Sequence, residues 1–244
     1  MRLLVFDTET SSPIPEEAFL VTAFLGLMDG EGKLLKEWNW VIDQGQPVPD
    51  EAAAIHGYTT QRVQAEGRKD VDAALLEILD VISENSGPGS QVPLVSHNSR
   101  FDLSLISREW ARHGLPVLPF DEYPILDTMT CDRALDKWRK GSRRLEDVAV
   151  HYGIELGKEG SAHSADYDAI LAGKIALKLR PKLRAMHKGG DFWEWMMDYQ
   201  GNAYRESALS FASYKRGEQK RKPDEIEPDF VAQLDWPVSP IVVA

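Results

Sequence analysis

This chain is poor in several residue types, and each scarcity excludes some classes of protein before any motif is considered. It has one cysteine, Cys131, in 244 residues, which excludes an internal disulfide framework and fits a reducing compartment. No apolar run approaches the length of a membrane span, and the N-terminus has no secretory signal pattern. We therefore expect a cytoplasmic protein that does not associate with a membrane.

Positive charge is also scarce, because 28 lysines and arginines face 39 acidic residues and the net charge is −11. This balance argues against attraction of nucleic acid by the surface as a whole. Local gatherings of basic residues are usually solvated helix faces or loops, but one of them lies partly in a loop and could touch a phosphate backbone. It consists of Arg133, Lys137, Arg139, Lys140, Arg143 and Arg144.

The first strand is followed by acidic residues and not by a glycine-rich phosphate loop, which disfavours a nucleotide-binding fold of that type. The apolar run at residues 3–6 predicts a buried strand that leads into Asp7-Thr8-Glu9. Because side chains alternate along a strand, Asp7 and Glu9 point the same way. Two carboxylates on one face are unfavourable to bury unless a cation such as Mg²⁺ lies between them.

The order of hydrophobic patterns predicts an α/β protein with a mixed sheet and helices packed on it. Strand patterns at 3–6, 19–28 and 34–43 are followed by alternating helices and short strands. Expected helices cover 70–84, 101–113 and 145–152, and a later one continues to Leu179 and ends at Pro181. A short helix is also expected from Asp50, and the short strands lie at 92–96 and 125–126. We divide the chain into a domain at 1–180 and a C-terminal helical extension at 181–244.

Two later acids could join the first pair. Asp102 follows a predicted strand and opens a helix, and Asp168 lies in the first turn of a later helix, five residues after His163. Either acid alone is more often a helix-start charge, which the helix dipole favours. Asp-x-Glu, Asn-x-x-Phe-Asp and His-x-x-x-x-Asp nevertheless occur in order and at sensible spacing, and the combination favours one shared site.

These motifs read FDTETSS, HNSRFD and HSADYD, and a further segment reads EAAAIHGYT. In them the chain resembles the DEDD exonucleases, in the branch that has a histidine in its third motif (DEDDh). Proofreading (epsilon) subunits of the DnaQ type are the most similar by pattern, and the resemblance covers roughly the first three quarters of the chain. One departure is Thr10-Ser11-Ser12, where the family usually has Thr-Thr-Gly, which puts the local backbone in question.

The resemblance implies a ribonuclease H-like fold, with a mixed five-stranded sheet and helices on both faces. It also implies two divalent metal ions, Mg²⁺ or Mn²⁺, about 4 Å apart, at the attacking and leaving oxygens. Their ligands would be Asp7, Glu9, Asp102 and Asp168, with Asp7 between the ions. His163 would be the general base, since imidazole titrates near neutral pH.

Residues near these acids are candidates for substrate binding. They are Thr8, Thr10, Glu51, His56, Asn98 and Phe101. For Glu51 and His56 this role rests on the family pattern alone. Three alternatives stay open: Glu51 as an exposed first-turn acid, Asn98 as a helix cap, and Phe101 as a core residue.

The predicted function is metal-dependent 3′–5′ exonuclease action at the 3′ end of single-stranded DNA, or of frayed or mismatched ends, with release of 5′-mononucleotides. An RNA-preferring enzyme is the first alternative, since no residue settles recognition of the 2′-hydroxyl. An inactive nucleic-acid-binding or polymerase-associated module is disfavoured, because it would not be expected to keep four acids and a histidine. A DNA polymerase is a candidate partner, and the sequence does not indicate the oligomeric state.

Overall fold

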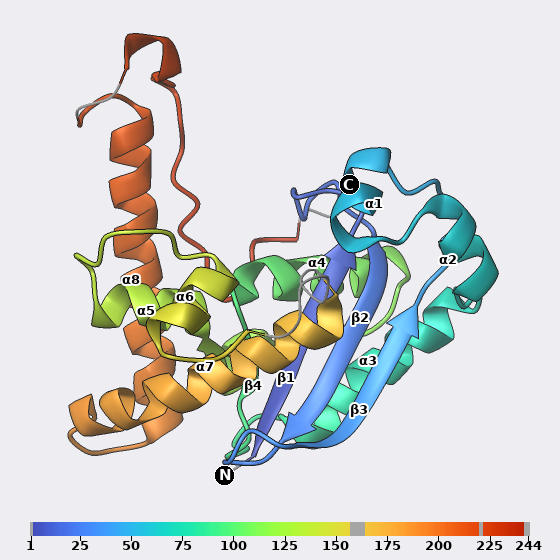
Figure 1. Cartoon of the computed structure of the whole chain (residues 1–244), viewed down its shortest axis with the longest axis horizontal. Helices are drawn as coiled ribbons and strands as arrows, with labels where there is room; N and C mark the ends of the chain where they lie inside the picture. The colour runs from blue at the N-terminus through green and yellow to red at the C-terminus, as the bar shows by residue number, and fades with distance from the viewer. Residues whose placement is uncertain (1, 157–163, 220–221, 242–244) are drawn as a thin grey trace.

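The computed structural model describes residues 2–156, 164–219 and 222–241. Five strands form one sheet in the order β3-β2-β1-β4-β5 (Figure 1). Their bounds are Leu3–Thr10 for β1, Leu20–Met28 for β2, Leu34–Val41 for β3, Leu94–Ser96 for β4 and Ile125–Asp127 for β5. β1 to β3 are antiparallel, while β4 is parallel to β1 and β5 is parallel to β4. The predicted mixed five-stranded α/β sheet is confirmed.

β1 is the central strand, and both of its faces are buried. Leu4 and Phe6 belong to a core beneath α3 (Val71–Asn85) and α4 (Ser99–Arg112). Leu3 and Val5 alternate with them and enter a second core beneath α7 (Ala165–Met186). The predicted placement of helices on both faces of the sheet is therefore confirmed (Figure 1).

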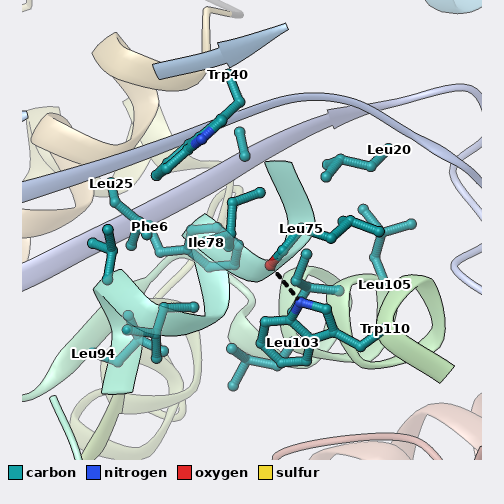
Figure 2. Close-up of a cluster of buried hydrophobic side chains, with 14 of the residues drawn as sticks. Phe6, Leu20, Leu25, Trp40, Leu75, Ile78, Leu94, Leu103, Leu105 and Trp110 are labelled. Atoms are coloured by element: carbon teal, nitrogen blue, oxygen red, sulfur yellow. Dashed lines mark hydrogen bonds between the residues drawn. The ribbon is translucent and has the colours of Figure 1, made fainter. Parts of the chain in front are cut away.

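The first core fixes α4, the helix that carries Asp102. Figure 2 shows the Trp110 indole of α4 lying against Leu75 of α3, with Phe6 of the sheet nearby. The buried Nε1–H of Trp110 donates a hydrogen bond to the Leu75 carbonyl oxygen at 3.0 Å. Because this polar group is satisfied, burial of the large ring stabilises the pair of helices and their place on the sheet.

The remaining helices are shorter, apart from one near the C-terminus. They are α1 (Asp50–His56), α2 (Thr60–Glu66), α5 (Thr128–Leu135), α6 (Leu145–His151) and α8 (Phe192–Lys215). Single 3₁₀ turns lie at Phe120–Glu122 and Pro223–Glu225. Sequence patterns did not predict α2, which has only seven residues and one buried side chain, Val63. In the described residues no helix has the length and apolar character needed to cross a bilayer.

The prediction that Pro181 ends the long helix is wrong, since α7 continues to Met186 with Pro181 inside it. Proline removes one backbone hydrogen bond and crowds the preceding turn, which normally stops a helix. Here the flanking residues Leu179 and Leu183 are both fully buried in the second core. Their packing outweighs the local penalty, so the helix persists for five residues beyond the proline.

The segment after residue 180 is joined to the sheet through α8. The buried side chain of Gln200 donates from Nε2 to the Ile125 carbonyl oxygen at 2.9 Å and accepts the Asp127 N–H at 2.8 Å. This amide pairs with the outer edge of β5 much as another strand would. The extension is therefore part of the packed structure, and the boundary at residue 180 stays a prediction.

The C-terminal tail lies along α4. Arg108 donates to the Ser239 hydroxyl at 2.7 Å, and the Ser239 N–H donates to the Ser104 hydroxyl at 2.8 Å. Arg100 donates to the Asp235 carbonyl oxygen at 2.7 Å. These contacts hold residues 235–239 against the helix that carries Asp102, on the side away from the sheet.

Gly173 allows α7 to approach the sheet closely, and we expect Gly173→Ala to destabilise the protein. A Cβ atom there would lie 2.6 Å from Met28 Sδ and 2.7 Å from Val5 Cγ1, so the helix or the strands would have to move. The expected loss in the free energy of unfolding, measured by urea denaturation, is about 1–3 kcal/mol.

Gly201→Ala in α8 is the matched control. The nearest atom to its new Cβ is the end of the flexible Arg205 side chain, at 3.4 Å, and alanine is the better helix former by about 1 kcal/mol. This variant should be unchanged or more stable. Equal stability of the Gly173 variant and the unaltered chain would contradict the close approach.

Candidate active site

The end of β1 projects beyond its neighbour β4. β4 pairs with β1 only at Leu4 and Val5 and ends at Ser96, whereas β1 continues to Thr10. Beyond β4 the chain turns at Asn98, whose φ of 72° and ψ of 48° lie in the left-handed region that asparagine tolerates better than most residues. The turn leads at once into α4, so that Asp102 in its first turn comes to lie beside β1.

A buried hydrogen bond joins β1 to α4. Thr8 Oγ1 donates to Asp102 Oδ1 at 2.7 Å, and the Asp102 side chain is almost fully buried. Thr8 lies on the opposite face of β1 from Asp7 and Glu9, which is the face that α4 covers. The strand therefore presents its two acids to α7 and uses the intervening threonine to position the acid of α4.

The pKa values show that the four predicted acids lie close together. Burial, followed by the charges of Asp102, Glu9 and Asp168, raises the pKa of Asp7 well above its usual value. Burial and then the charges of Asp168 and Asp102 raise the pKa of Glu9 to about 8. Burial raises the pKa of Asp102 to about 7, although the hydrogen bond from Thr8 opposes this. Acids from β1, α4 and α7 thus repel one another at one end of the sheet.

A group of neighbouring carboxylates suits the binding of a cation. In this structure, however, the carboxylates would have to move closer together to act as ligands of one ion. Among the described residues, no group of three or more His, Cys, Asp or Glu side chains could hold a metal ion as it stands. Small movements of the carboxylates toward a divalent ion would relieve their repulsion and supply the oxygen ligands that such ions prefer. His163, the predicted general base, lies outside the described residues, which resume at Ser164, immediately before α7.

A cavity of about 460 Å³ opens beside these acids, between the end of β1 and α1. Its lining includes Glu9 and most of the residues predicted to bind substrate, namely Thr8, Thr10, Glu51, His56 and Phe101. Asn98 is not among its lining residues. Asn98 occupies the N-cap position of α4, as the helix-cap alternative expects, but its side chain makes no capping hydrogen bond there.

His56 is held in a fixed and uncharged state at the side of the cavity. Its Nδ1 accepts the Tyr58 N–H at 3.1 Å, which leaves the ring proton on Nε2. Burial lowers the pKa of His56 below its usual value, so the ring is neutral at pH 7. His56 therefore forms a neutral part of the cavity wall and adds no positive charge to it.

Two residues at the site were not predicted. Ile55 lines the cavity and is 61% exposed. Its position next to His56 in the sequence could have indicated a place at the site, but its exposure depends on how α1 packs.

The second residue is Asp127. Its carboxylate accepts the N–H of Asn98 at 3.0 Å and the N–H groups of Met129 and Thr130, and so it fixes the turn before α4.

His97 has a structural role beside the site. One ring nitrogen lies 2.8 Å from Thr128 Oγ1 and the other lies 2.9 Å from the Arg143 carbonyl oxygen. The ring connects the end of β4 with the start of α5 and with the segment that precedes α6.

Comparison with known proteins identifies the family of the chain that carries this site. A family model for exonucleases, RNase_T, matches residues 4–176. The chain belongs to this exonuclease family. Membership confirms the predicted resemblance to DEDD-type 3′–5′ exonucleases, which are enzymes that hydrolyse phosphodiester bonds.

Two relatives show where else such a domain occurs. The PolC-type DNA polymerase III of Streptococcus suis is 27% identical over 174 residues, which is 70% of this chain and 11% of that protein. A DNA polymerase III subunit epsilon-like protein of Rhodobacter capsulatus is 26% identical over 187 residues, which is 76% of this chain and 24% of that protein. The chain thus spans less than a quarter of the length of either relative.

Solved structures share the exonuclease fold. A structure of exonuclease I has a TM-score of 0.63 at 18% identity, over 86% of this chain and 45% of that one. The E. coli enzyme in complex with a dT13 oligonucleotide has a TM-score of 0.59 at 21% identity, over 75% and 42%. At these identities the likeness shows the fold, and it confirms the predicted ribonuclease H-like architecture.

The departure from the exonuclease pattern at Ser12 does not strain the backbone. Of the non-glycine residues that the structure describes, Asn98 alone has a positive φ, so the conformation at Ser12 does not require glycine. The Ser12 carbonyl oxygen accepts a hydrogen bond from Thr10 Oγ1 at 2.8 Å. The substitution is therefore accommodated within the wall of the cavity.

We expect Thr8→Val to lower exonuclease activity about 10- to 100-fold, as is typical when a group that orients a metal ligand is removed. Valine keeps the shape of threonine but cannot donate to Asp102, whose carboxylate would then be free to turn. The rate of nucleotide release from a labelled oligonucleotide measures the effect. Thr8→Ser keeps the donor and should retain most of the activity, and equal loss in both variants would contradict this role.

Proposed function

We propose that this protein is a metal-dependent 3′–5′ exonuclease that removes 5′-mononucleotides from the 3′ end of single-stranded DNA, or from frayed or mismatched ends. The observation that carries the proposal is the convergence of Asp7, Glu9, Asp102 and Asp168 beside a cavity. Family membership supports it. The likeness to E. coli exonuclease I, which has been solved with dT13 and dA16 oligonucleotides, supports single-stranded DNA as the substrate.

The four carboxylates would hold two divalent ions, Mg²⁺ or Mn²⁺, with Asp7 between them. When bound, such ions supply positive charge at the phosphate and make a water molecule acidic enough to yield a nucleophile near neutral pH. E. coli exonuclease I, of similar fold, has been solved with zinc and single-stranded DNA, which supports a requirement for divalent ions here.

The cavity would receive the terminal nucleotide. A volume of about 460 Å³ lies within the usual range for small-molecule sites. Thr10 and Glu51 offer polar groups to the sugar, while Ile55 and Phe101 offer apolar surface to the base. Thr8 would keep Asp102 oriented, and His163 would take the proton from the attacking water.

We place this activity in the cytoplasm, on the evidence of the single cysteine, Cys131. A DNA polymerase is the partner that we propose. Two named relatives support it, because one is a PolC-type polymerase and the other is an epsilon-like subunit protein of DNA polymerase III.

The proposal is tested by time courses on three end-labelled substrates: single-stranded DNA, duplex DNA with a mismatched 3′ end, and RNA. We expect the DNA substrates to be shortened from the 3′ end in Mg²⁺ or Mn²⁺, and excess chelator to stop the reaction. Asp7→Ala should lower the rate at least about 100-fold, since it removes a charge that the reaction needs. Asp166→Ala, an exposed acid in the same first turn of α7 as Asp168, is the control and should be active.

The outcomes separate the alternatives. Faster degradation of RNA than of DNA would replace the proposal with the RNA-preferring enzyme. No cleavage of any substrate with metal present would favour a nucleic-acid-binding module. Full activity of Asp7→Ala would overturn the role of the carboxylate cluster.

A further inference from the structure

A second cavity, of about 660 Å³, lies between α8 and the segment that runs from α5 to α6. We call it the α5–α8 groove. Arg133, Lys137 and Trp138 line one side, and Tyr199, Asn202 and Phe211 of α8 line the other. α8 stands on the opposite side of the molecule from α1, so this groove is separate from the cavity at the end of β1 (Figure 1).

The groove is basic in a chain that is acidic overall. Its lining contains four cationic side chains and one carboxylate, Glu206, which pairs with Lys137 at 3.1 Å. The cations are Arg133, Lys137, Arg139 and Arg143. This excess of positive charge, in a protein with a net charge of −11, favours an anionic occupant.

Two of these four cations form ion pairs inside the protein, and this fixes one wall of the groove. Arg139 and Arg143 both bind the buried carboxylate of Asp132, at 2.6 Å and 2.5 Å. Burial alone would raise the pKa of Asp132, but hydrogen bonds from these arginines and from Tyr152 lower it. Because two guanidinium groups share one carboxylate, the wall keeps a net positive charge, although the side chains of Arg139 and Arg143 are only 10% and 12% exposed.

An exposed aromatic ring accompanies these charges. Trp138 is 86% exposed, with the Lys137 ammonium group 6.0 Å from the centre of its ring, and Phe211 across the groove is 53% exposed. Exposed apolar side chains that gather in one place, unlike single ones, often mark an interaction site. Aromatic side chains beside cations are how many proteins bind single strands, since the bases stack on the rings and the phosphates pair with the cations.

The groove is joined to the catalytic end of the sheet. His97, which binds the carbonyl oxygen of Arg143 at 2.9 Å, directly precedes the Asn98 turn into α4. Arg143 belongs to the wall of the groove, and the turn determines the place of Asp102. The wall of the groove is therefore connected, through the His97 ring, to the turn that positions Asp102.

We propose that the α5–α8 groove is a second binding site for single-stranded nucleic acid, which holds the strand upstream of the 3′ end while the terminal nucleotide lies in the cavity at β1. The proposal rests on the proposed exonuclease function. It makes the protein favour substrates long enough to reach both sites, because the second contact is then intramolecular.

The test compares oligothymidylates of two lengths. Binding of 5′-labelled dT20 is measured by fluorescence anisotropy in excess chelator, and KM is measured with Mg²⁺ for dT20 and for the dinucleotide dT2. Trp138→Ala should raise the Kd and the KM for dT20 about 10-fold, as expected for the loss of base stacking, and leave the KM for dT2 unchanged. Trp138→Phe, which keeps a ring, should recover part of the loss.

Lys137→Ala should also weaken binding of dT20 and reduce its dependence on salt. The matched control is Lys36→Ala, since Lys36 is an exposed lysine beside an indole, with its Nζ 4.4 Å from the ring centre of Trp38 on β3. Unchanged binding of dT20 by Trp138→Ala, or an equal rise in the KM for dT2, would overturn the proposal.

The binding arm contains no metal and requires no cleavage. Loss of dT20 binding in Trp138→Ala therefore supports the groove even if the unaltered protein cuts nothing, in which case only the proposed function fails.

Discussion

The burial of carboxylates close to one another at the end of β1 is unfavourable, and the surrounding fold has to compensate for it. Asp7 and Glu9 share one face of β1, and Asp102 and Asp168 approach the same end of the strand from two helices. Burial, followed by the charges of Asp168 and Asp102, raises the pKa of Glu9 to about 8, and burial raises the pKa of Asp102 to about 7. Proteins tolerate such an arrangement mainly where function needs it.

The contacts that hold these acids together against their repulsion lie on both faces of the sheet. On one face, Gly173 lets α7 approach β1 closely, which sets the place of Asp168. On the other, the early end of β4, the left-handed turn at Asn98 and the Trp110 contact together fix α4. The C-terminal extension contributes as well, because its tail lies on α4 and α8 docks on β5 and forms one wall of the basic groove.

Much of this could be predicted from the sequence, because it depends on local patterns. The alternation of β1 predicted that Asp7 and Glu9 share a face, and the order of the motifs predicted the family. The features that the sequence did not predict depend on packing between segments that are distant in the sequence. Pro181 is tolerated because Leu179 and Leu183 are buried, and the exposure of Ile55 depends on where α1 lies. The composition of the basic group was visible, but its division into arginines that bind Asp132 and residues that face solvent was not.

Calorimetric titration with Mn²⁺ at pH 7, in buffers of different ionisation enthalpy, shows whether these carboxylates form a metal site. Without the ion, Glu9 and Asp102 carry protons for much of the time at this pH, because their pKa values are about 8 and about 7. Ligands must lose their protons to bind a metal. We expect two ions to bind per chain with net release of protons, and this binding to be lost in Asp7→Asn. Absence of binding, or the same heat and proton release in Asp7→Asn, would contradict it.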